Sequence, residues 1–381
     1  MLSLESIREH SVKLDLNLIG AVDCGSARTA LSESGKYLSK WQSSGFAADM
    51  DYMKRDVELF TNPDNFLKNC KSILCFAVPY QSKHLAVPSK KGFGRVARYA
   101  WGLDYHKVIK TKLGSLVEAL KAKLTASQQL EVRIFTDAVP LLERVLAAES
   151  KLGFIGNNSL LIRPGMGSYF FIAEVLLNVE LDPEELRELK VPGNRAELDL
   201  LQPGQGCGTC IKCVDDCPTD AILANGVIDS NKCISYLTIE KRTNFDDWES
   251  SAIGDWIFGC DICQEVCPFN HEENLDFLSE FSSGNGVGPY LELKQVLEIS
   301  DKTDFIKKFA KTTLVRAKRE GLLRNACSVA ANTHCFELVE QIASIAQYDS
   351  SDSLREHAHA TLVRMSRLAE GSDKRKLLKM I

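Results

Sequence analysis

The chain of 381 residues lacks any apolar run long enough to span a membrane. Its most apolar stretch, SYFFIAEVLLNVEL, is short and is interrupted by Glu174. The first residues, MLSLESIREHS, lack the apolar core of a signal peptide. The net charge of −5 provides no general excess of positive charge for binding nucleic acids. From these absences we expect a soluble, cytoplasmic protein.

Two common nucleotide-binding motifs are also missing. Neither a G-x-G-x-x-G run nor a P-loop lysine motif occurs, so nucleotide binding has no support from the sequence. The apolar content of 45% and the charged content of 25% are ordinary for a globular protein. The length predicts two to three domains.

Cysteine, in contrast, is abundant and clustered. Eight of the thirteen cysteines lie between positions 207 and 267, and the first four form a C-x2-C-x2-C-x3-C-P run. This spacing is typical of bacterial two-cluster ferredoxins, in which the fourth cysteine of a run ligates the other cluster. The pattern predicts two [4Fe–4S] clusters. One is held by Cys207, Cys210, Cys213 and Cys267, and the other by Cys217, Cys233, Cys260 and Cys263.

Two structural zinc sites are the alternative, because zinc also accepts four thiolates. The two C-x3-C-P endings favour iron–sulfur clusters. The five remaining cysteines have no partner spacing, and we expect them to be small buried hydrophobic residues.

Three domains are predicted along the chain. Residues 1–205 alternate helical and strand-like patterns, which indicates an α/β domain with helices over a buried sheet. Residues 206–280 form a ferredoxin-like two-cluster module. Residues 290–381 are helical, with two similar helical patterns that resemble one HEAT-type repeat unit. A Gly/Ser-rich linker precedes this third domain.

Asp137 is the best candidate acid in the first domain. It follows the predicted strand EVRIFT, and the carboxyl ends of strands in open α/β sheets face the ligand crevice. A half-desolvated carboxyl group at that edge can hold a proton near neutral pH and deliver it. The alternative is an ordinary helix cap, which local sequence alone favours.

Two basic regions carry further hypotheses. Arg98 belongs to the segment GRVARYAWGLDYHK, which is suited either to holding the anionic or amide-rich groups of a large cofactor or to starting a capped helix. Positions 307–324 carry seven cations and a single acid, so a phosphate-backbone partner and a solvated surface are about equally supported. The cations are Lys307, Lys308, Lys311, Arg316, Lys318, Arg319 and Arg324.

Several segments together resemble the epoxyqueuosine reductase family over nearly the entire chain. They are TDAVPLLERVLAAESKLGFIGNNSLLI, GSYFFIAEVLL, the two-cluster cysteine pattern, CISYLTIEKR and RAKREGLLRNA, in the order found in that family. The resemblance implies a cobalamin-binding domain similar to that of reductive dehalogenases, two [4Fe–4S] clusters and a C-terminal repeat that binds tRNA. It implies reduction of epoxyqueuosine to queuosine at the wobble position (34) of tRNA, the last step of queuosine biosynthesis.

The resemblance also implies roles for individual residues. Electrons from an external one-electron donor would pass through the clusters to give cob(I)alamin, and Asp137 would be the proton donor. Arg98, Asp137, Asn158, Leu161 and Ile172 match segments that contact cobalamin. Residues that match the RNA-binding parts are Thr238, Lys241, Arg242, Lys318, Arg319 and Arg324. We expect a monomer without a membrane partner.

Two positions depart from the family pattern. Phe60 stands where many relatives have an arginine, and Asn157 stands where many have a lysine. Two other functions stay open: a cobalamin-dependent reductase of a small molecule such as an organohalide, and a two-cluster electron carrier. The basic C-terminal region argues against the first, and the long α/β domain argues against the second.

Overall fold

The computed structural model describes residues 1–80, 88–123, 129–191, 202–223, 226–271 and 277–378. The chain forms two compact units, each assembled from separate segments. Unit 1 comprises Met1–His84, Tyr105–Asp229 and Ile262–Phe281, and unit 2 comprises Leu85–Asp104, Ser230–Asp261 and Ser282–Ile381. These units differ from the consecutive domains predicted above, because the predicted cluster module is divided between them.

Unit 1 is built on a four-stranded sheet in which every neighbouring pair is antiparallel. The two central strands pair over eight residues, from Ser72 opposite Leu177 to Pro79 opposite Phe170. In spatial order the strands are β1 (Leu18–Asp23), β2 (Ser72–Pro79), β7 (Phe170–Leu177) and β4 (Val132–Phe135). The central strands are almost entirely buried, as their continuous apolar sequences predict.

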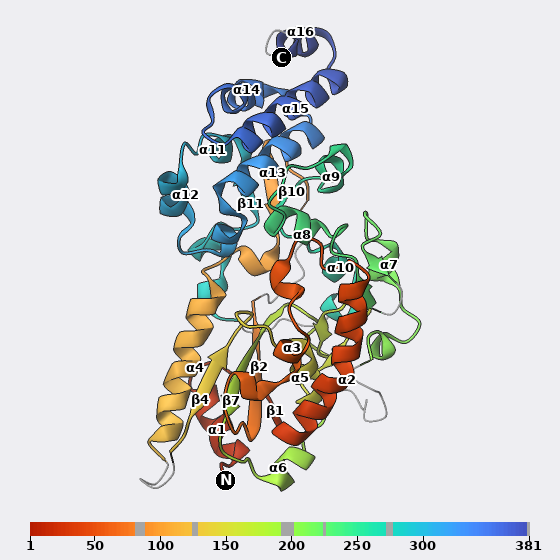
Figure 1. Ribbon diagram of the computed structural model, residues 1–381. Coiled ribbons are helices and arrows are strands. Elements are labelled where there is room, and N and C mark those ends of the chain that lie inside the picture. Colours follow the sequence, from red (N-terminus) through yellow and green to blue (C-terminus); the bar gives the residue numbers. More distant parts are fainter. Residues whose placement is uncertain (81–87, 124–128, 192–201, 224–225, 272–276, 379–381) are drawn as a thin grey trace. The chain divides into compact units, whose positions relative to one another are not determined.

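Helices cover both faces of this sheet, and Figure 1 shows the strands between α4 and α2. The helices are α1 (Leu4–Val12), α2 (Cys24–Ser43), α4 (Tyr105–Lys121) and α5 (Glu143–Glu149). Helix α2 begins where the Asp23 side chain accepts a hydrogen bond from the Ser26 amide at 2.9 Å. Helix α5 packs against α2 and the strands β1, β2 and β7, and contributes four buried residues to an apolar core of unit 1.

The predicted strands and helices of this unit are present, and the sheet that the strands form is antiparallel. Alternating strand and helix patterns are compatible with either direction of pairing, since periodicity reports burial and not neighbours. In the observed sheet, β4 ends beside the start of β7. Because neighbouring strands are antiparallel, their carboxyl ends lie alternately at the two opposite ends of the sheet.

Smaller elements complete unit 1. Strand β6 pairs with β5, and an isolated bridge between Arg163 and Gly167 closes the turn that follows β6. The elements are α3 (Glu58–Thr61), β5 (Phe154–Ile155), β6 (Leu161–Ile162), α6 (Pro183–Arg187), α7 (Lys212–Asp215), β8 (Ile222–Leu223), β9 (Val227–Ile228) and α10 (Ile262–Glu265).

Unit 2 contains a small mixed sheet with β3 at its centre, parallel to β10 and antiparallel to β11. The strands are β3 (Phe93–Val96), β10 (Trp256–Phe258) and β11 (Tyr290–Glu292). Helix α13 packs against β10, α8, α9, α11 and α15. The helices are α8 (Ile234–Ile239), α9 (Asp247–Ala252), α11 (Leu293–Leu297), α12 (Lys302–Phe309), α13 (Lys318–Asn332), α14 (Val339–Tyr348), α15 (Asp352–Leu368) and α16 (Gly371–Leu377).

The C-terminal region is helical as predicted, except that it opens with strand β11. The two similar helical patterns correspond to α13 and α15, which pack against each other. Among the described residues, no helix has the length and apolarity needed to cross a membrane.

Candidate functional site

Asp137 lies two residues beyond the end of β4 and has a left-handed backbone conformation, with φ of 50°. Its side chain is exposed, so the predicted half-desolvated carboxyl group is a wrong expectation. The helix-cap alternative is also wrong, since Leu142 occupies the N-cap position of α5. The phenol of Tyr105 donates a hydrogen bond to Asp137 Oδ2 at 2.9 Å, and its ring stacks on Phe171 with centroids 4.1 Å apart.

This arrangement places Asp137 beside the start of β7. Phe135 is opposite Glu174 in the β4–β7 pairing, so continuing the register by two residues brings the chain level with Ile172. Ile172 is partly exposed, in contrast to its buried neighbours Phe171 and Ala173. An exposed carboxyl group and a partly exposed aliphatic side chain therefore lie at the same end of the sheet.

Two carboxyl groups behind Asp137 were not predicted. The Asp137 amide donates a hydrogen bond to Glu143 Oε1 at 2.7 Å. Burial and the charge of Asp137 raise the pKa of Glu143 to about 8. Glu174 is fully buried in β7, and burial followed by the charge of Glu143 raises its pKa well above the ordinary value.

The Glu174 side chain can form a hydrogen bond with Glu143 only when one of the two carboxyl groups is protonated. As two carboxylates, Glu143 and Glu174 have no donor between them, and both buried oxygens of Glu174 then have no partner within the described structure. With one group protonated, the two side chains form a hydrogen bond. The sequence did contain a signal, because Glu174 is a single acid in an otherwise apolar strand.

Asn158 and Leu161 belong to the β5–β6 region and are 4% and 3% exposed. Leu161 lies in the same apolar core of unit 1 as α5, and Ile172 packs against that core. The Asn158 side-chain amide points to the carbonyl oxygen of Cys263 at 3.5 Å. The structure thus brings Leu161 and Ile172 into one core and links Asn158 to a predicted cluster ligand.

The two family departures have clear structural settings. Asn157 donates from its backbone amide to Cys207 Sγ at 3.5 Å and from its side-chain amide to the Cys210 carbonyl at 2.9 Å. Asn157 therefore ties the β5–β6 loop to the first cluster-binding run. Phe60 is 2% exposed, and its carbonyl accepts a hydrogen bond from the Leu142 amide at 3.3 Å.

The first predicted ligand set lies entirely within unit 1. Burial raises the pKa of Cys213 to about 12, with further contributions from the charges of Cys207, Cys267 and Cys210, in that order. Burial disfavours the free thiolates of Cys213 and Cys267, which fits a site whose thiolates are stabilised by bound metal. In the described part of the chain, no three His, Cys, Asp or Glu side chains are close enough to share one metal ion. Cluster ligands, in contrast, bind separate iron atoms.

The second predicted set is divided between the units. Cys217 and Cys263 belong to unit 1, and Cys233 and Cys260 belong to unit 2, so their grouping stays a prediction. The Ala221 amide donates to Cys217 Sγ at 3.4 Å. Next to Cys260, Asp261 accepts hydrogen bonds from the backbone amide of Arg98 at 2.7 Å and from its guanidinium at 3.0 Å.

Arg98 is 1% exposed, and its guanidinium lies 5.6 Å from the Trp101 ring. Its contacts with Asp261 and Trp101 give it a structural role beside a predicted cluster ligand. The predicted contact between Arg98 and cobalamin stays a prediction.

Most of the predicted RNA-binding residues are not surface cations. Arg319 and Arg324 are 4% and 3% exposed, so the prediction that they contact phosphates is wrong. Arg319 pairs with Asp349 and donates to the Ile299 carbonyl. Arg324 donates to the carbonyls of Leu237, Lys241 and Thr243, at 2.8, 2.9 and 2.7 Å.

Three further predicted RNA-binding residues belong to the CISYLTIEKR segment, and each makes contacts within unit 2. They are Thr238, Lys241 and Arg242. Thr238 is fully buried and accepts a hydrogen bond from the Gly259 amide at 2.9 Å, which corrects its predicted contact with RNA. Lys241 pairs with Glu249 at 3.0 Å, and Arg242 donates to the Ile239 carbonyl at 3.0 Å. Arg242 is itself exposed, so its contact with RNA stays a prediction. Further exposed cations are found on and near α12: Lys302, Lys307, Lys308, Lys311, Arg316 and Lys318.

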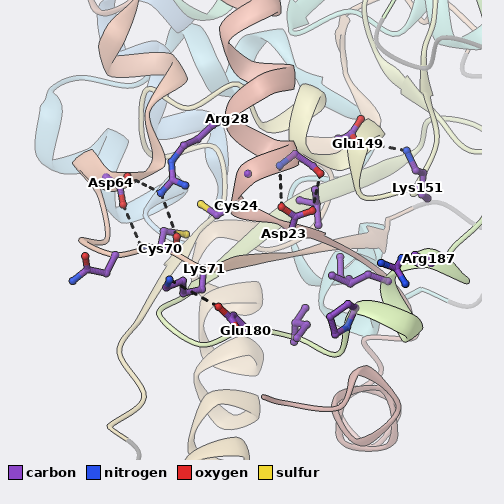
Figure 2. A pocket seen from close by; sticks show the side chains of 18 of the residues that line it. Asp23, Cys24, Arg28, Asp64, Cys70, Lys71, Glu149, Lys151, Glu180 and Arg187 are labelled. Carbon is purple, nitrogen blue, oxygen red and sulfur yellow. Dashed lines mark hydrogen bonds and ion pairs between the residues drawn. The ribbon is translucent and has the colours of Figure 1, made fainter.

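A large pocket lies at the end of the unit 1 sheet that is opposite to Asp137 (Figure 2). It has a volume of about 1010 Å³ and is lined by residues at the end of β1, before β2 and after β7. Figure 2 shows Cys24 and Cys70 in its wall, near the pair formed by Arg28 and Asp64 at 2.7 Å. Since β4 runs antiparallel to β7, Asp137 is at the other edge, and this pocket is not part of the candidate active site.

The fold and the cysteine pattern define a class of iron–sulfur proteins in which the cluster-binding segment accompanies a helix-covered sheet. Residues 206–270 match the family model "4Fe-4S double cluster binding domain", and residues 61–138 match "Epoxyqueuosine reductase QueG, DUF1730". The epoxyqueuosine reductase of Cyclobacterium marinum is 34% identical over 326 residues, covering 84% of this chain and 97% of the relative. That of Aliivibrio fischeri is 31% identical over 339 residues, covering 87% and 84%. The chain belongs to the epoxyqueuosine reductase family and is an oxidoreductase.

Solved structures of epoxyqueuosine reductases share the fold. One in complex with an epoxyqueuosine-modified stem loop of tRNA-Tyr has a TM-score of 0.79, with 24% identity, and covers 99% of this chain and 97% of that chain. Another, from Bacillus subtilis, has its catalytic aspartate loop swung out of the active site; its TM-score is 0.77, with 24% identity and the same coverage.

Proposed function

We propose that this protein reduces epoxyqueuosine to queuosine at the wobble position of tRNA. The reaction takes an epoxide, two electrons and two protons, and gives an alkene and water. Family membership supports the substrate, and so does the complex of a similar protein with a modified tRNA stem loop. The observation that carries the proposal is the exposed, firmly held Asp137 in the same unit as four clustered thiols.

We propose that cobalamin would lie against the accessible residues at the end of the sheet where β4 ends and β7 begins. Asp137 and Ile172 are accessible there, whereas Asn158 and Leu161 are buried and would support the adjoining loop. Cobalamin, when bound, would supply low-potential reduction of the substrate carbon, and the two [4Fe–4S] clusters would deliver electrons from an external one-electron donor.

Asp137 would protonate the oxygen that leaves the epoxide, which avoids the release of a free alkoxide. Because Tyr105 donates to Oδ2, the other carboxyl oxygen, Oδ1, is the one available to carry the proton. The phenol also fixes the carboxyl plane relative to β7. Tyr105 therefore acts as a positioning residue for the proton donor.

We infer that the C-terminal helices form a HEAT-like repeat that contributes to RNA binding. The surface cations of the α12 region replace the buried arginines as candidate phosphate contacts. Lys307 and Lys308 lie in the last turn of α12 and are exposed. Their role is electrostatic and independent of sequence.

Asp137→Asn tests the proposed mechanism, because asparagine keeps the shape but cannot donate an acidic proton. We expect turnover to fall by roughly 10²- to 10⁴-fold while cobalamin absorbance and iron content are retained. Asp15→Asn is a matched control, since Asp15 is also an aspartate with positive φ, in this case 60°. Full activity of the Asp137→Asn variant would remove this residue from the mechanism.

A further inference from the structure

The loop that carries Asp137 is held in an unfavourable conformation by its surroundings. A non-glycine residue with φ of 50° is uncommon, so contacts from the surroundings are expected to hold this conformation. Two contacts act on different parts of Asp137: Tyr105 holds the carboxyl group, and Glu143 holds the backbone amide. The amide contact fixes the direction in which the side chain leaves the backbone.

Glu143 is well placed to provide a rigid restraint. It is the first residue of α5, a helix packed between α2 and the central strands. Its Oε1 is 2.7 Å from the Asp137 nitrogen, and a carboxylate accepts such a bond more strongly than a neutral carboxyl group does. The strength of this restraint therefore depends on the charge of Glu143.

Glu174 is the second carboxyl group that acts on Asp137, through its contact with Glu143. It is fully buried in β7, directly opposite Phe135 on β4 and Cys75 on β2. The charged or titratable groups that face this pair are Asp137 from the loop after β4, Arg144 from α5 and Cys75 from β2. Burial and mutual repulsion keep a proton between Glu143 and Glu174 near neutral pH.

We propose that Glu143 is a positioning residue for Asp137, and that Glu174 controls its orientation and charge through a shared proton. The inference rests on the proposed role of Asp137 as proton donor. A buried acid in an apolar strand is costly. In this arrangement that acid tunes a contact to the residue that carries the chemistry.

The first test uses the ligand-free protein, selectively labelled with ¹⁵N-aspartate, and follows the Asp137 amide resonance with pH. We expect an inflection near the Glu143 pKa of about 8, with the amide proton moving downfield as Glu143 ionises. Glu143→Gln retains an acceptor oxygen but cannot ionise, so the inflection disappears. Glu174→Leu removes the hydrogen bond from Glu174 that lowers the pKa of Glu143, so the inflection moves to higher pH.

The second test compares turnover across pH for Glu143→Ala and Glu143→Gln. The alanine variant loses the acceptor, and we expect kcat to fall roughly 10- to 100-fold with KM for tRNA within twofold, since misplacing a catalytic group by about 1 Å costs this much. The glutamine variant should recover most of kcat and show a flatter pH profile. Glu149→Gln, on the same helix but at the opposite edge of the sheet, is the control.

The outcomes separate the two proposals. If Asp137→Asn is inactive while Glu143→Ala retains full kcat, the positioning role is wrong and the proposed function stands. If Asp137→Asn is itself active, the proposed mechanism fails. Should Glu143→Ala not fold, the amide titration decides: an Asp137 resonance with no inflection, or one unaffected by Glu143→Gln, overturns the inference.

Discussion

At the scale of single residues, burial decides which charges are available for function. Arg319 and Arg324 are part of a basic sequence run, yet both guanidinium groups are enclosed and bound to backbone carbonyls. Charge counting along a sequence cannot distinguish these arginines from exposed lysines such as Lys318. The environment of Asp137 shows the same limitation, since the residue was identifiable but Tyr105, Glu143 and Glu174 were not.

Replacing Arg324 should affect stability far more than replacing Lys318. Arg324→Met leaves three carbonyls, one buried and two partly buried, without their donor, so we expect the free energy of unfolding to fall by about 3 kcal/mol. Lys318→Met should change it by less than about 0.5 kcal/mol. Urea denaturation of the two variants checks this, and equal midpoints would show that the internal hydrogen bonds of Arg324 contribute little.

The buried carboxyl group of Glu174 should make stability depend on pH. Its pKa is raised in the folded protein, so its contribution to stability is fully present below the ordinary value of 4.5 and is lost as pH rises through the folded value. Glu174→Gln is neutral throughout. We therefore expect its melting temperature, relative to the unmodified protein, to increase from pH 5.5 to pH 8.5; a constant difference would contradict a buried titrating group.

At the scale of helices and strands, the sequence predicted most elements of unit 1 but not how they pair. Continuous apolar runs identify β2 and β7 as buried strands, whereas their antiparallel register depends on contacts between residues about a hundred positions apart. The pairing of the strands in unit 2 is even harder to predict from the sequence. Three short segments from distant parts of the chain form one sheet, and no local pattern predicts such pairing.

The exposed face of α12 gives an element-scale prediction. Reversing Lys307 and Lys308 to glutamate should weaken tRNA binding and reduce the slope of log affinity against log salt by roughly 1.5 to 2, since about one counterion is released per lost phosphate contact. The matched control reverses Lys36 and Lys40, which are exposed on α2. An unchanged slope in the α12 variant, or an equal change in the control, would assign these lysines to a solvated surface.

At the scale of the whole molecule, the eight-cysteine pattern was the most informative part of the sequence. Its spacing predicted the double-cluster domain that the family comparison identifies at residues 206–270. The boundaries of compact units could not be predicted in this way, because unit 2 recruits residues 85–104 from within the first predicted domain. The amino-acid composition does not change where the chain passes from one unit to the other, so the sequence does not reveal these boundaries.

The central claim is that this chain reduces epoxyqueuosine in tRNA with cobalamin as its cofactor. The most direct test incubates anaerobically reconstituted protein and a reductant with epoxyqueuosine-containing tRNA, with and without cobalamin, and identifies the nucleosides by mass spectrometry. We predict that queuosine forms only when cobalamin is present. Absence of queuosine from protein shown to hold both clusters and cobalamin would contradict the account.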